Sequence, residues 1–189
     1  QDMSATGKRH DFVADYAVGF DEEGRIEAVE GQWAARCGFA ADLSGPVTDR
    51  ALFHADNAYY YPNVRLKSRP MKTNTVSNTA FRGFGGPQGV IVAERMIEEI
   101  AYALGKDTLD IRRANFYGVG ERDVTPYHQT VEDNILERLI GELEDTSDYQ
   151  KRREEIIAFN AKGGILRRGI ALTPVKFGIS FTATWYNQA

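Results

Sequence analysis

The stretch TNTVSNTAFRGFGGPQGVIVAERMIEEIAYALG (residues 73–105) joins a glycine-rich loop directly to a helical pattern. Its first seventeen residues contain four glycines, two phenylalanines and one arginine. Pro87 stands where a first helical turn tolerates a missing N–H, and Gly105 suits a C-terminal cap. Apolar residues recur between them at helical spacing, at Ala93, Met96, Ile97, Ile100 and Leu104. The stretch therefore predicts a loop that opens a long amphipathic helix.

The residues before this loop predict strands. Residues 11–20 and 25–39 read as two strands around a tight turn in which Gly24 is free to take positive φ, so we expect an antiparallel hairpin. A short helix is expected to begin near Pro46 and to carry Arg50. Prolines at both ends of residues 62–70 bracket another expected strand.

The residues after the loop predict further helices and a return to sheet. Asp107 is suited to cap a second, shorter helix, and residues 118–131 read as a polar loop. Residues 132–162 indicate two more amphipathic helices with solvated charged faces. Two glycines at 163–164 end the helical region, and residues 165–186, rich in β-branched and aromatic types, predict a strand.

These patterns predict one α+β unit. We expect antiparallel strands at the N- and C-terminal parts, with the glycine loop and about four helices between them. Residues 1–86 would hold most strands and the substrate and cofactor loop, residues 87–162 the helices, and residues 163–189 the last strand. At 189 residues the chain is long enough to bury a substantial apolar core.

Composition excludes several classes of protein. The single Cys37 rules out a disulfide framework within the chain, three scattered histidines form no zinc-like cluster, and a reducing, cytoplasmic setting fits best. The net charge of −4 gives no reason to expect nucleic acid, and no apolar run is long enough for a membrane span. The chain lacks an initiator Met and stops within an apolar run, so we expect it to be an internal piece of a longer polypeptide.

Positive charge is concentrated in one window of the sequence. Residues 50–82 contain six bases and one acid, a sum of +5 in a chain of −4. The bases are Arg50, Arg65, Lys67, Arg69, Lys72 and Arg82. They indicate either solvated strand faces or a groove for an anionic ligand.

The glycine loop lacks the residues of two phosphate-binding motifs. No Lys-Ser/Thr pair follows its glycines, as a Walker loop requires, and Gly83, Gly85 and Gly86 fit the dinucleotide fingerprint poorly. The glycines could bring main-chain N–H groups close to an oxyanion or a metal-oxo group, or they could only permit a tight turn. Phe81 and Phe84 likewise suit either a stacking surface for a planar ligand or a core anchor.

Three stretches together carry a family resemblance. They are DRALFHADNAYYYPNV (residues 49–64), KTNTVSNTAFRGFGGPQG (72–89) and PVKFGISFTATWYNQA (174–189). In this order and at this spacing they resemble the molybdenum-binding part of the xanthine dehydrogenase family, the purine branch of the molybdenum hydroxylases. The resemblance covers the chain from end to end, and SNTAFRGFGGPQ is its most specific part.

The resemblance implies roles for particular residues. Phe84 would stack on a bound purine, Phe181 would hold the purine from another side, and Thr182 would contact it with its hydroxyl group. Arg50 would face the oxygen-bearing side of the purine. The segment that lies against the molybdenum ligands and donates main-chain N–H groups would be Ala80, Phe81, Arg82 and Gly83. None of these residues, Arg82 included, would bind the metal directly.

The implied reaction is the hydroxylation of xanthine or hypoxanthine. In the family a molybdenum-bound hydroxide attacks an electron-poor ring carbon, hydride passes to a sulfido ligand, and negative charge accumulates on the ring. A fixed guanidinium near that charge stabilises the transition state more than the ground state. Arginine suits this role because it stays protonated and offers paired donors to carbonyl oxygens.

The resemblance also implies what the chain lacks. The family's general base is a glutamate beyond the present C-terminus, so no catalytic residue is expected here, and a second purine-orienting glutamate lies upstream of Gln1. We expect the 189-residue chain alone to be inactive and to retain no molybdopterin. Iron-sulfur clusters and FAD would lie in partner domains or subunits, and the parent enzyme is expected to be oligomeric.

Two alternatives remain. An aldehyde oxidase-type member of the same family would share the glycine loop without needing Arg50. A non-catalytic α+β binding module would use the basic window alone, with its bases on separate surfaces instead of converging with Phe84 and Phe181. His54, Cys37 and the tyrosines at 59–61 are assigned structural roles in either case.

Overall fold

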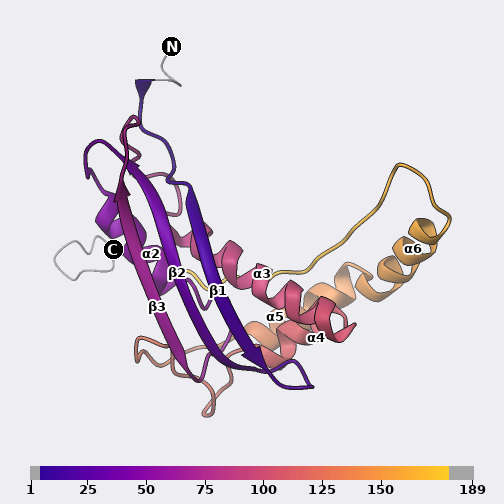
Figure 1. The fold of residues 1–189 in the computed structure, drawn as a ribbon. Helices are drawn as coiled ribbons and strands as arrows, with labels where there is room; N and C mark the ends of the chain where they lie inside the picture. Colours follow the sequence, from indigo (N-terminus) through magenta and orange to yellow (C-terminus); the bar gives the residue numbers. More distant parts are fainter. Residues whose placement is uncertain (1–4, 179–189) are drawn as a thin grey trace.

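A computed structural model describes residues 5–178 of the chain. Its sheet contains, in spatial order, β1 (Phe12–Phe20), β2 (Ile26–Gly38) and β3 (Val64–Lys72). Two helices, α2 (Ser44–Phe53) and α3 (Gly86–Leu104), cover one face of this sheet (Figure 1). The α+β class that the sequence predicts is therefore confirmed.

The predicted N-terminal hairpin is also confirmed. β1 pairs with β2 in antiparallel register, with Val18 opposite Val29. Gly24, in the connecting turn, has a φ of 87°, in the left-handed region that glycine occupies at little cost. A Cβ atom placed on Gly24 would lie 2.4 Å from Cδ1 of Ile111. The turn thus needs glycine for its conformation and for its close approach to the core.

β3 runs parallel to β2, so the expectation that the N-terminal strands are antiparallel is wrong for this pair. Parallel neighbours need a crossover connection that returns the chain to the starting end of the sheet. α2 and the turns after it form that connection. Pro70 lies inside β3 instead of ending it, and its missing N–H is tolerated because β3 is an edge strand of the described sheet.

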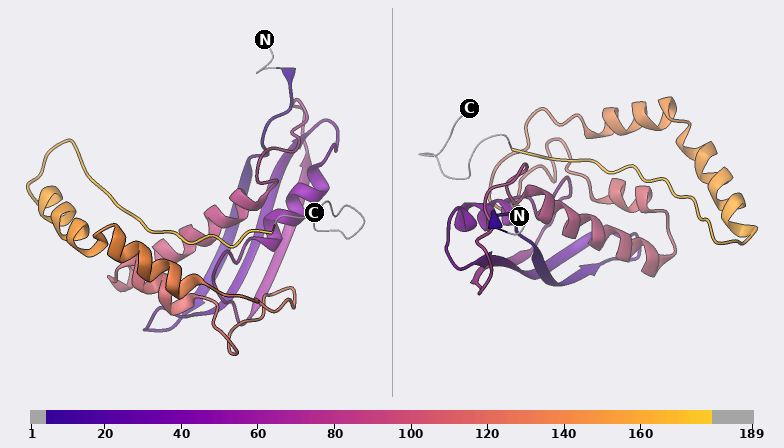
Figure 2. Two further views of the ribbon diagram at one scale, coloured as in Figure 1. Left: turned by 180° about the vertical axis from the view of Figure 1, so that it is seen from behind. Right: turned by 90° about the horizontal axis from the view of Figure 1, so that it is seen from above.

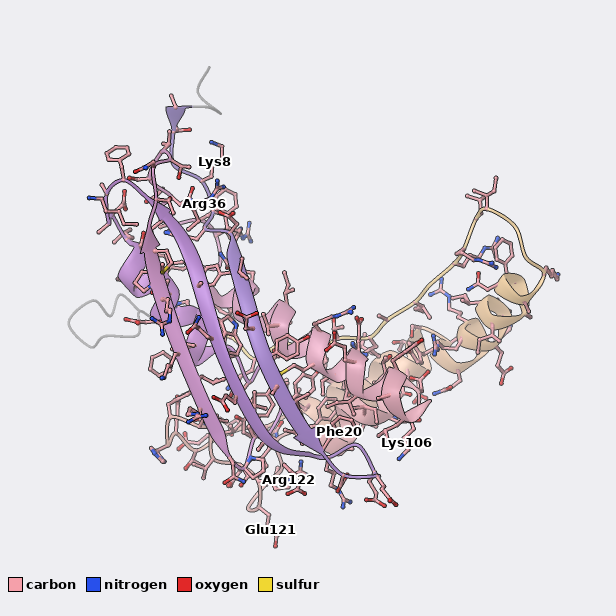
Figure 3. The ribbon with its side chains drawn as sticks, viewed as in Figure 1. Lys8, Phe20, Arg36, Lys106, Glu121 and Arg122 are labelled. Atoms are coloured by element: carbon pink, nitrogen blue, oxygen red, sulfur yellow. The ribbon has the colours of Figure 1, made fainter. Side chains whose placement is uncertain are left out.

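The glycine loop lies at one end of the sheet, and the C-terminal end of α3 lies at the other (Figure 3). Lys8 and Arg36 mark the end at which β2 and β3 finish, and Phe20 and Lys106 mark the opposite end. The glycine loop leaves the sheet at the Arg36 end. α3 then runs to the opposite end, where Lys106 Nζ donates a hydrogen bond of 2.7 Å to Glu22 O.

α3 supplies the centre of the hydrophobic core, as its apolar spacing predicts. Its fully buried side chains include Met96, Ile97 and Ile100. The helix ends at Gly105, whose φ of 64° is left-handed. The next helix, α4 (Thr108–Asn115), begins after Asp107, whose carboxylate accepts a 2.8 Å hydrogen bond from the N–H of Leu109. Both helix boundaries confirm the sequence interpretation.

Glycines allow α2 and the start of α3 to pack backbone against backbone. A Cβ atom on Gly89 would lie 2.2 Å from Ala51 O, and one on Gly85 would lie 2.0 Å from Val47 O. Gly85 also has a φ of 99°, so a side chain there would be strained for two reasons. At these two positions glycine is therefore required by packing, in addition to the tight turn that the sequence analysis considered.

The C-terminal part of the fold differs from the expectation. Helices α5 (Leu136–Thr146) and α6 (Tyr149–Ala161) extend away from the sheet, and the chain then runs back toward α2 (Figure 2). The strand expected from residue 165 onward is absent over residues 165–178, and residues 179–189 lie outside the described part of the chain. We call residues 170–178 the strap. Its main-chain groups bind the side chains of Asn57 and His54 instead of a neighbouring strand, which accounts for the difference.

None of the helices among residues 5–178 has the length and apolar character needed to cross a membrane.

The close packing of α2 on α3 is testable by a glycine substitution. Gly89→Ala is expected to lower the free energy of unfolding by more than about 2 kcal/mol, because the methyl group would push the two helices apart. Urea denaturation measures the change. Gly141→Ala in α5 is the matched control, since no atom lies within 4 Å of its added Cβ. There the helix propensity of alanine is expected to raise stability by about 0.5 kcal/mol, and equal effects at both glycines would contradict the packing account.

Candidate functional site

Arg50 places a buried positive charge on α2. Only 5% of the residue is exposed. Its Cζ lies 5.9 Å from the centre of the Phe84 ring and 5.5 Å from that of the Phe177 ring. Its Nη1 donates a 2.8 Å hydrogen bond to Gly178 O. Burial lowers the pKa of Arg50 from its ordinary value, although a guanidinium remains protonated in proteins. The site therefore has a fixed cation between two aromatic rings.

Phe84 is held in an uncommon backbone conformation. Its φ of 52° is left-handed, and the flanking Gly83 and Gly85 have φ values of 89° and 99°. Such a conformation costs a non-glycine residue on the order of 1 kcal/mol. The turn is closed by hydrogen bonds from Phe84 N–H to Phe81 O, 2.7 Å, and from Gly86 N–H to Gly83 O, 2.8 Å. The glycine loop thus holds the Phe84 ring beside the guanidinium.

His54 connects α2 to the strap. Its Nδ1 lies 3.0 Å from Arg50 O, and its Nε2 lies 3.3 Å from the Gly178 nitrogen, whose N–H donates to it. A neutral imidazole with its proton on Nδ1 satisfies both contacts. The centres of the His54 and Phe177 rings are 4.8 Å apart. Burial lowers the pKa of His54, which favours this neutral form.

A second polar contact joins the strap to the residues after α2. The Lys176 ammonium contacts the buried Asp56 carboxylate and lies 3.2 Å from the Tyr127 hydroxyl oxygen. The Tyr117 hydroxyl donates a 2.5 Å hydrogen bond to the same carboxylate. Burial raises the pKa of Asp56, and both Lys176 and Tyr117 oppose that shift. The charge of Lys176 is therefore compensated within the fold.

The positive charge of Arg50, unlike that of Lys176, is not compensated by a carboxylate of the described residues. Among residues 5–178 no carboxylate forms an ion pair with Arg50, and its Nε is buried without a hydrogen-bond partner. A buried guanidinium with one carbonyl contact retains most of its five donors. Because an unpaired buried charge is costly, the arrangement favours a ligand that brings oxygen acceptors or negative charge to Arg50.

Arg50 and His54 line a cavity of about 630 Å³ between α2, the strap and residues 125–132, and Phe84 is not part of its lining. α2 contributes Arg50 and Phe53, and the strap contributes Lys176 and Phe177. Small-molecule sites commonly have volumes of about 300 to 1,000 Å³ and combine apolar walls with a few polar groups. The cavity therefore has the size and lining expected for a small, flat, polar ligand.

The segment that the sequence analysis assigned to cofactor contact lies at the surface. Ala80, Phe81 and Arg82 are exposed, and Gly83 is half-buried. The guanidinium of Arg9 lies 4.5 Å from the centre of the Phe81 ring and donates a 2.6 Å hydrogen bond to Arg82 O. The segment is thus anchored through a ring and a carbonyl group rather than through its N–H groups.

The main-chain donor groups of this segment bear on its fit to a molybdenum cofactor. Within the part of the chain that the structure describes, the main-chain N–H groups of Ala80, Phe81 and Arg82 make no hydrogen bond. Three such donors beside a left-handed turn suit the oxygen atoms of an anionic group. No group of three or more His, Cys, Asp or Glu side chains that could hold a metal ion occurs among residues 5–178. The residues fit a cofactor held through main-chain donors and not a metal bound by side chains.

The structure brings together some of the predicted substrate residues. Arg50 and Phe84 meet as expected. Phe181 and Thr182 lie outside the described residues.

The interpretation of the basic window as one groove is wrong. Arg65 and Arg69 project from the exposed face of the sheet, where they bind Glu30 and Gln32, while Arg50 is buried behind the opposite face. These two arginines are residues of a solvated strand face.

Sequence reasoning missed the contribution of the strap. His54 was assigned a structural role, and neither Lys176 nor Phe177 was singled out, yet all three line the cavity. The available signal was positional, since HADN and VKFG lie inside two of the stretches that carry the family resemblance.

Comparison with known protein families and sequences gives consistent matches. The family of molybdopterin cofactor-binding domains matches residues 1–116. A xanthine dehydrogenase of Dictyostelium discoideum is 47% identical over 188 residues, and a xanthine dehydrogenase/oxidase of Felis catus is 44% identical over 189 residues. A nicotinate hydroxylase of Emericella nidulans is 44% identical over 191 residues. Each match covers 100% of this chain but 14% of the relative.

Solved structures with the same fold include an aldehyde oxidoreductase and a CO dehydrogenase. The aldehyde oxidoreductase of Desulfovibrio gigas superposes with a TM-score of 0.74 at 30% identity, over 80% of this chain and 16% of that one. The CO dehydrogenase of Oligotropha carboxidovorans gives a TM-score of 0.75 at 22% identity, over 84% of this chain and 20% of the other, a likeness of fold alone.

The buried histidine makes stability depend on pH. The pKa of His54 is lowered from 6.5 by burial, so the unfolded state takes up its proton at a higher pH than the folded state. The stabilising contribution is therefore present above the ordinary pKa and is lost as the pH falls through the folded pKa. Urea denaturation from about pH 7.5 to about pH 5.5 should show a smaller loss of stability for His54→Asn than for the unchanged protein. An equal or larger loss in the variant would contradict this assignment.

Proposed function

Since this chain belongs to the family of molybdopterin cofactor-binding domains, we propose that it forms the arginine-bearing wall of the substrate pocket in a molybdenum hydroxylase that oxidises xanthine or hypoxanthine. One observation carries the proposal. Arg50 is a buried guanidinium beside the Phe84 ring, and no carboxylate pairs with it among the described residues. A flat substrate with carbonyl oxygens would bring acceptors to the guanidinium and place its ring beside an aromatic side chain.

Arg50 would act on the substrate through charge and orientation. Its hydrogen bond to Gly178 O and the neighbouring rings fix the guanidinium before any ligand arrives. Donors that are already oriented need no reorganisation when negative charge develops on the purine ring, so they favour the transition state. In a site with little water this interaction is stronger than it would be in solution.

Phe84 would orient the ring of the substrate. Its left-handed backbone is fixed by the two hydrogen bonds that close the turn, from Phe84 N–H to Phe81 O and from Gly86 N–H to Gly83 O. A rigid aromatic face orients a flat ligand while adding little preference for charge. Phe181 and Thr182 complete the proposed substrate contacts.

Ala80, Phe81, Arg82 and Gly83 would hold the molybdenum cofactor through their main-chain N–H groups. When bound, the cofactor supplies the redox centre of the reaction. The general base, the iron-sulfur clusters and FAD are proposed to belong to other parts of the enzyme or to partner subunits. A cytoplasmic location and an oligomeric assembly remain predictions.

Two features bear on the choice of substrate. Relatives with nearly equal identity are named as xanthine dehydrogenases and as a nicotinate hydroxylase, and an aldehyde oxidoreductase shares the fold. Overall identity therefore does not select the substrate. The unpaired Arg50 favours a ring that carries oxygen atoms away from the carbon that reacts, whereas the single oxygen of a simple aldehyde is on the reacting carbon. Arg65 and Arg69 lie on a separate surface, as a non-catalytic binding module would have them, but the meeting of Arg50 with Phe84 favours an enzyme.

Substitution of the arginine tests the proposal. In the full-length protein, Arg50→Met is expected to lower kcat/KM for xanthine by about a hundredfold, because the charge on the ring would lose its stabilising donor. Steady-state oxidation of xanthine measures the effect. An aromatic aldehyde is expected to lose less, since it does not depend on that donor.

Arg69→Met is the matched control for this experiment. It removes an arginine from the exposed sheet face, and we expect xanthine oxidation to stay at the rate of the unchanged protein. An undiminished xanthine rate in Arg50→Met would refute the role of Arg50. Aldehyde oxidation without xanthine oxidation by the unchanged protein, with the aldehyde rate kept in Arg50→Met, would favour the aldehyde oxidase-type alternative.

A further inference from the structure

We propose that the HADN turn (residues 54–57), which follows α2, positions the substrate-binding arginine by holding the strap in place. For the role of Arg50 this inference rests on the proposed function. The holding of the strap itself rests on contacts within residues 5–178. The hydrogen bonds that join the strap to the turn and to Arg50 connect residues 117 to 128 positions apart in the sequence.

Asn57 binds the strap as a neighbouring strand would. Its Nδ2 donates a 3.0 Å hydrogen bond to Pro174 O, and its Oδ1 accepts a 3.2 Å hydrogen bond from the N–H of Lys176. Two alternate residues of an extended segment thus find a donor and an acceptor in one side chain. This pairing replaces the ladder that a sheet would provide. Asn57 has a φ of 45°, a left-handed value that asparagine tolerates better than most residues.

A buried network fixes the orientation of Asn57. Glu94, on α3, accepts hydrogen bonds at Oε1 from Asn57 Nδ2 over 2.8 Å and from the Tyr59 hydroxyl over 2.5 Å. Its Oε2 pairs with Arg112 of α4, at 2.9 Å from Nε and 2.8 Å from Nη2. Arg112 is 1% exposed. The Asn57 amide therefore cannot reverse its donor and acceptor without losing the contact to Glu94, and α3 and α4 both contribute to its placement.

The other polar residues of the turn hold the next part of the strap. Asp56 binds the side chain of Lys176, and His54 accepts from the N–H of Gly178. The same Gly178 accepts from Nη1 of Arg50 at its carbonyl oxygen. The turn therefore controls the carbonyl group that orients the guanidinium.

The ring of Phe177 is placed by the same contacts. It lies between Lys176 and Gly178, both held by the turn, and it packs closely on Gly86, where an added Cβ would lie 2.5 Å from its Cε2 atom. Phe177 is also one of the two rings beside Arg50. Release of the strap would consequently remove both a ring and a carbonyl contact from the arginine.

Hydrogen–deuterium exchange of the full-length protein tests the holding of the strap. In Asn57→Gly we expect the peptide that covers residues 172–178 to exchange about tenfold faster, because one fixed donor and acceptor pair is lost. Glycine is chosen because it keeps the left-handed backbone without strain. Asp148→Gly is the matched control, since Asp148 is also left-handed, with a φ of 51°, and lies at the start of α6. The control should leave exchange of this peptide unchanged.

His54→Ala gives a second, independent variant. It removes the acceptor of the Gly178 N–H and should also speed exchange of the strap peptide, so it decides the question if Asn57→Gly does not fold. Unchanged exchange in a folded variant of either kind would overturn the proposal. Mass spectrometry of the intact variants before labelling confirms that each carries only its intended change.

Xanthine oxidation by the same variants tests the link from the strap to Arg50. Faster exchange together with a loss of about tenfold in kcat/KM, and normal activity of Asp148→Gly, would support it. Faster exchange with undiminished kcat/KM would overturn the link. If the unchanged protein oxidises no purine, the proposed substrate fails, while the exchange experiment still decides whether the HADN turn holds the strap.

Discussion

The close approach of α2 to the first turn of α3 is the constraint on which the rest of the structure depends. It is possible because Gly85 and Gly89 leave room for the carbonyl groups of Val47 and Ala51. Arg50 is carried by α2, and Phe84 stands directly before Gly85, so the distance between the helices also sets the distance between cation and ring. The glycine loop thus serves packing and also sets the position of the Phe84 ring, so the two roles considered for it are compatible.

The cationic side chains of the fold differ in whether a carboxylate pairs with them. Lys176, Arg112 and Arg113 each pair with a carboxylate inside or beside the fold. Arg50 is buried, with 5% of the residue exposed, but has a single carbonyl contact and no paired acid among the described residues. A protein that leaves such a group unpaired gives up stability for a binding site, which is typical of functional residues.

Local patterns predicted the elements of this fold well. The hairpin, α3 and α4 follow from strand runs, helical spacing and caps that lie within a few residues of one another. The direction of β3 could not be predicted in this way, because it depends on how α2 returns the chain across the sheet. The strap has the composition of a strand but finds its partners in Asn57 and His54, more than 100 residues earlier in the sequence. Its conformation depends on tertiary contacts that local sequence does not reveal.

Some residues of the site could likewise be predicted from the sequence, whereas others depend on tertiary contacts. Arg50 and Phe84 were identified because they stand in stretches that resemble a known family, and the structure brings them together. His54, Lys176 and Phe177 acquire their places only when the strap meets the turn after α2, so neither spacing nor composition pointed to them. Of the two interpretations of the basic window, the groove is wrong for a related reason, since alternation along β3 sends Arg65 and Arg69 to the exposed face of the sheet.

The most direct test of the central claim is a structure of the full-length protein with a purine bound. The account predicts that a purine oxygen lies within about 3.2 Å of a guanidinium nitrogen of Arg50 and that the Phe84 ring lies against the purine ring. A purine bound elsewhere, with Arg50 contacting only Gly178, would contradict it.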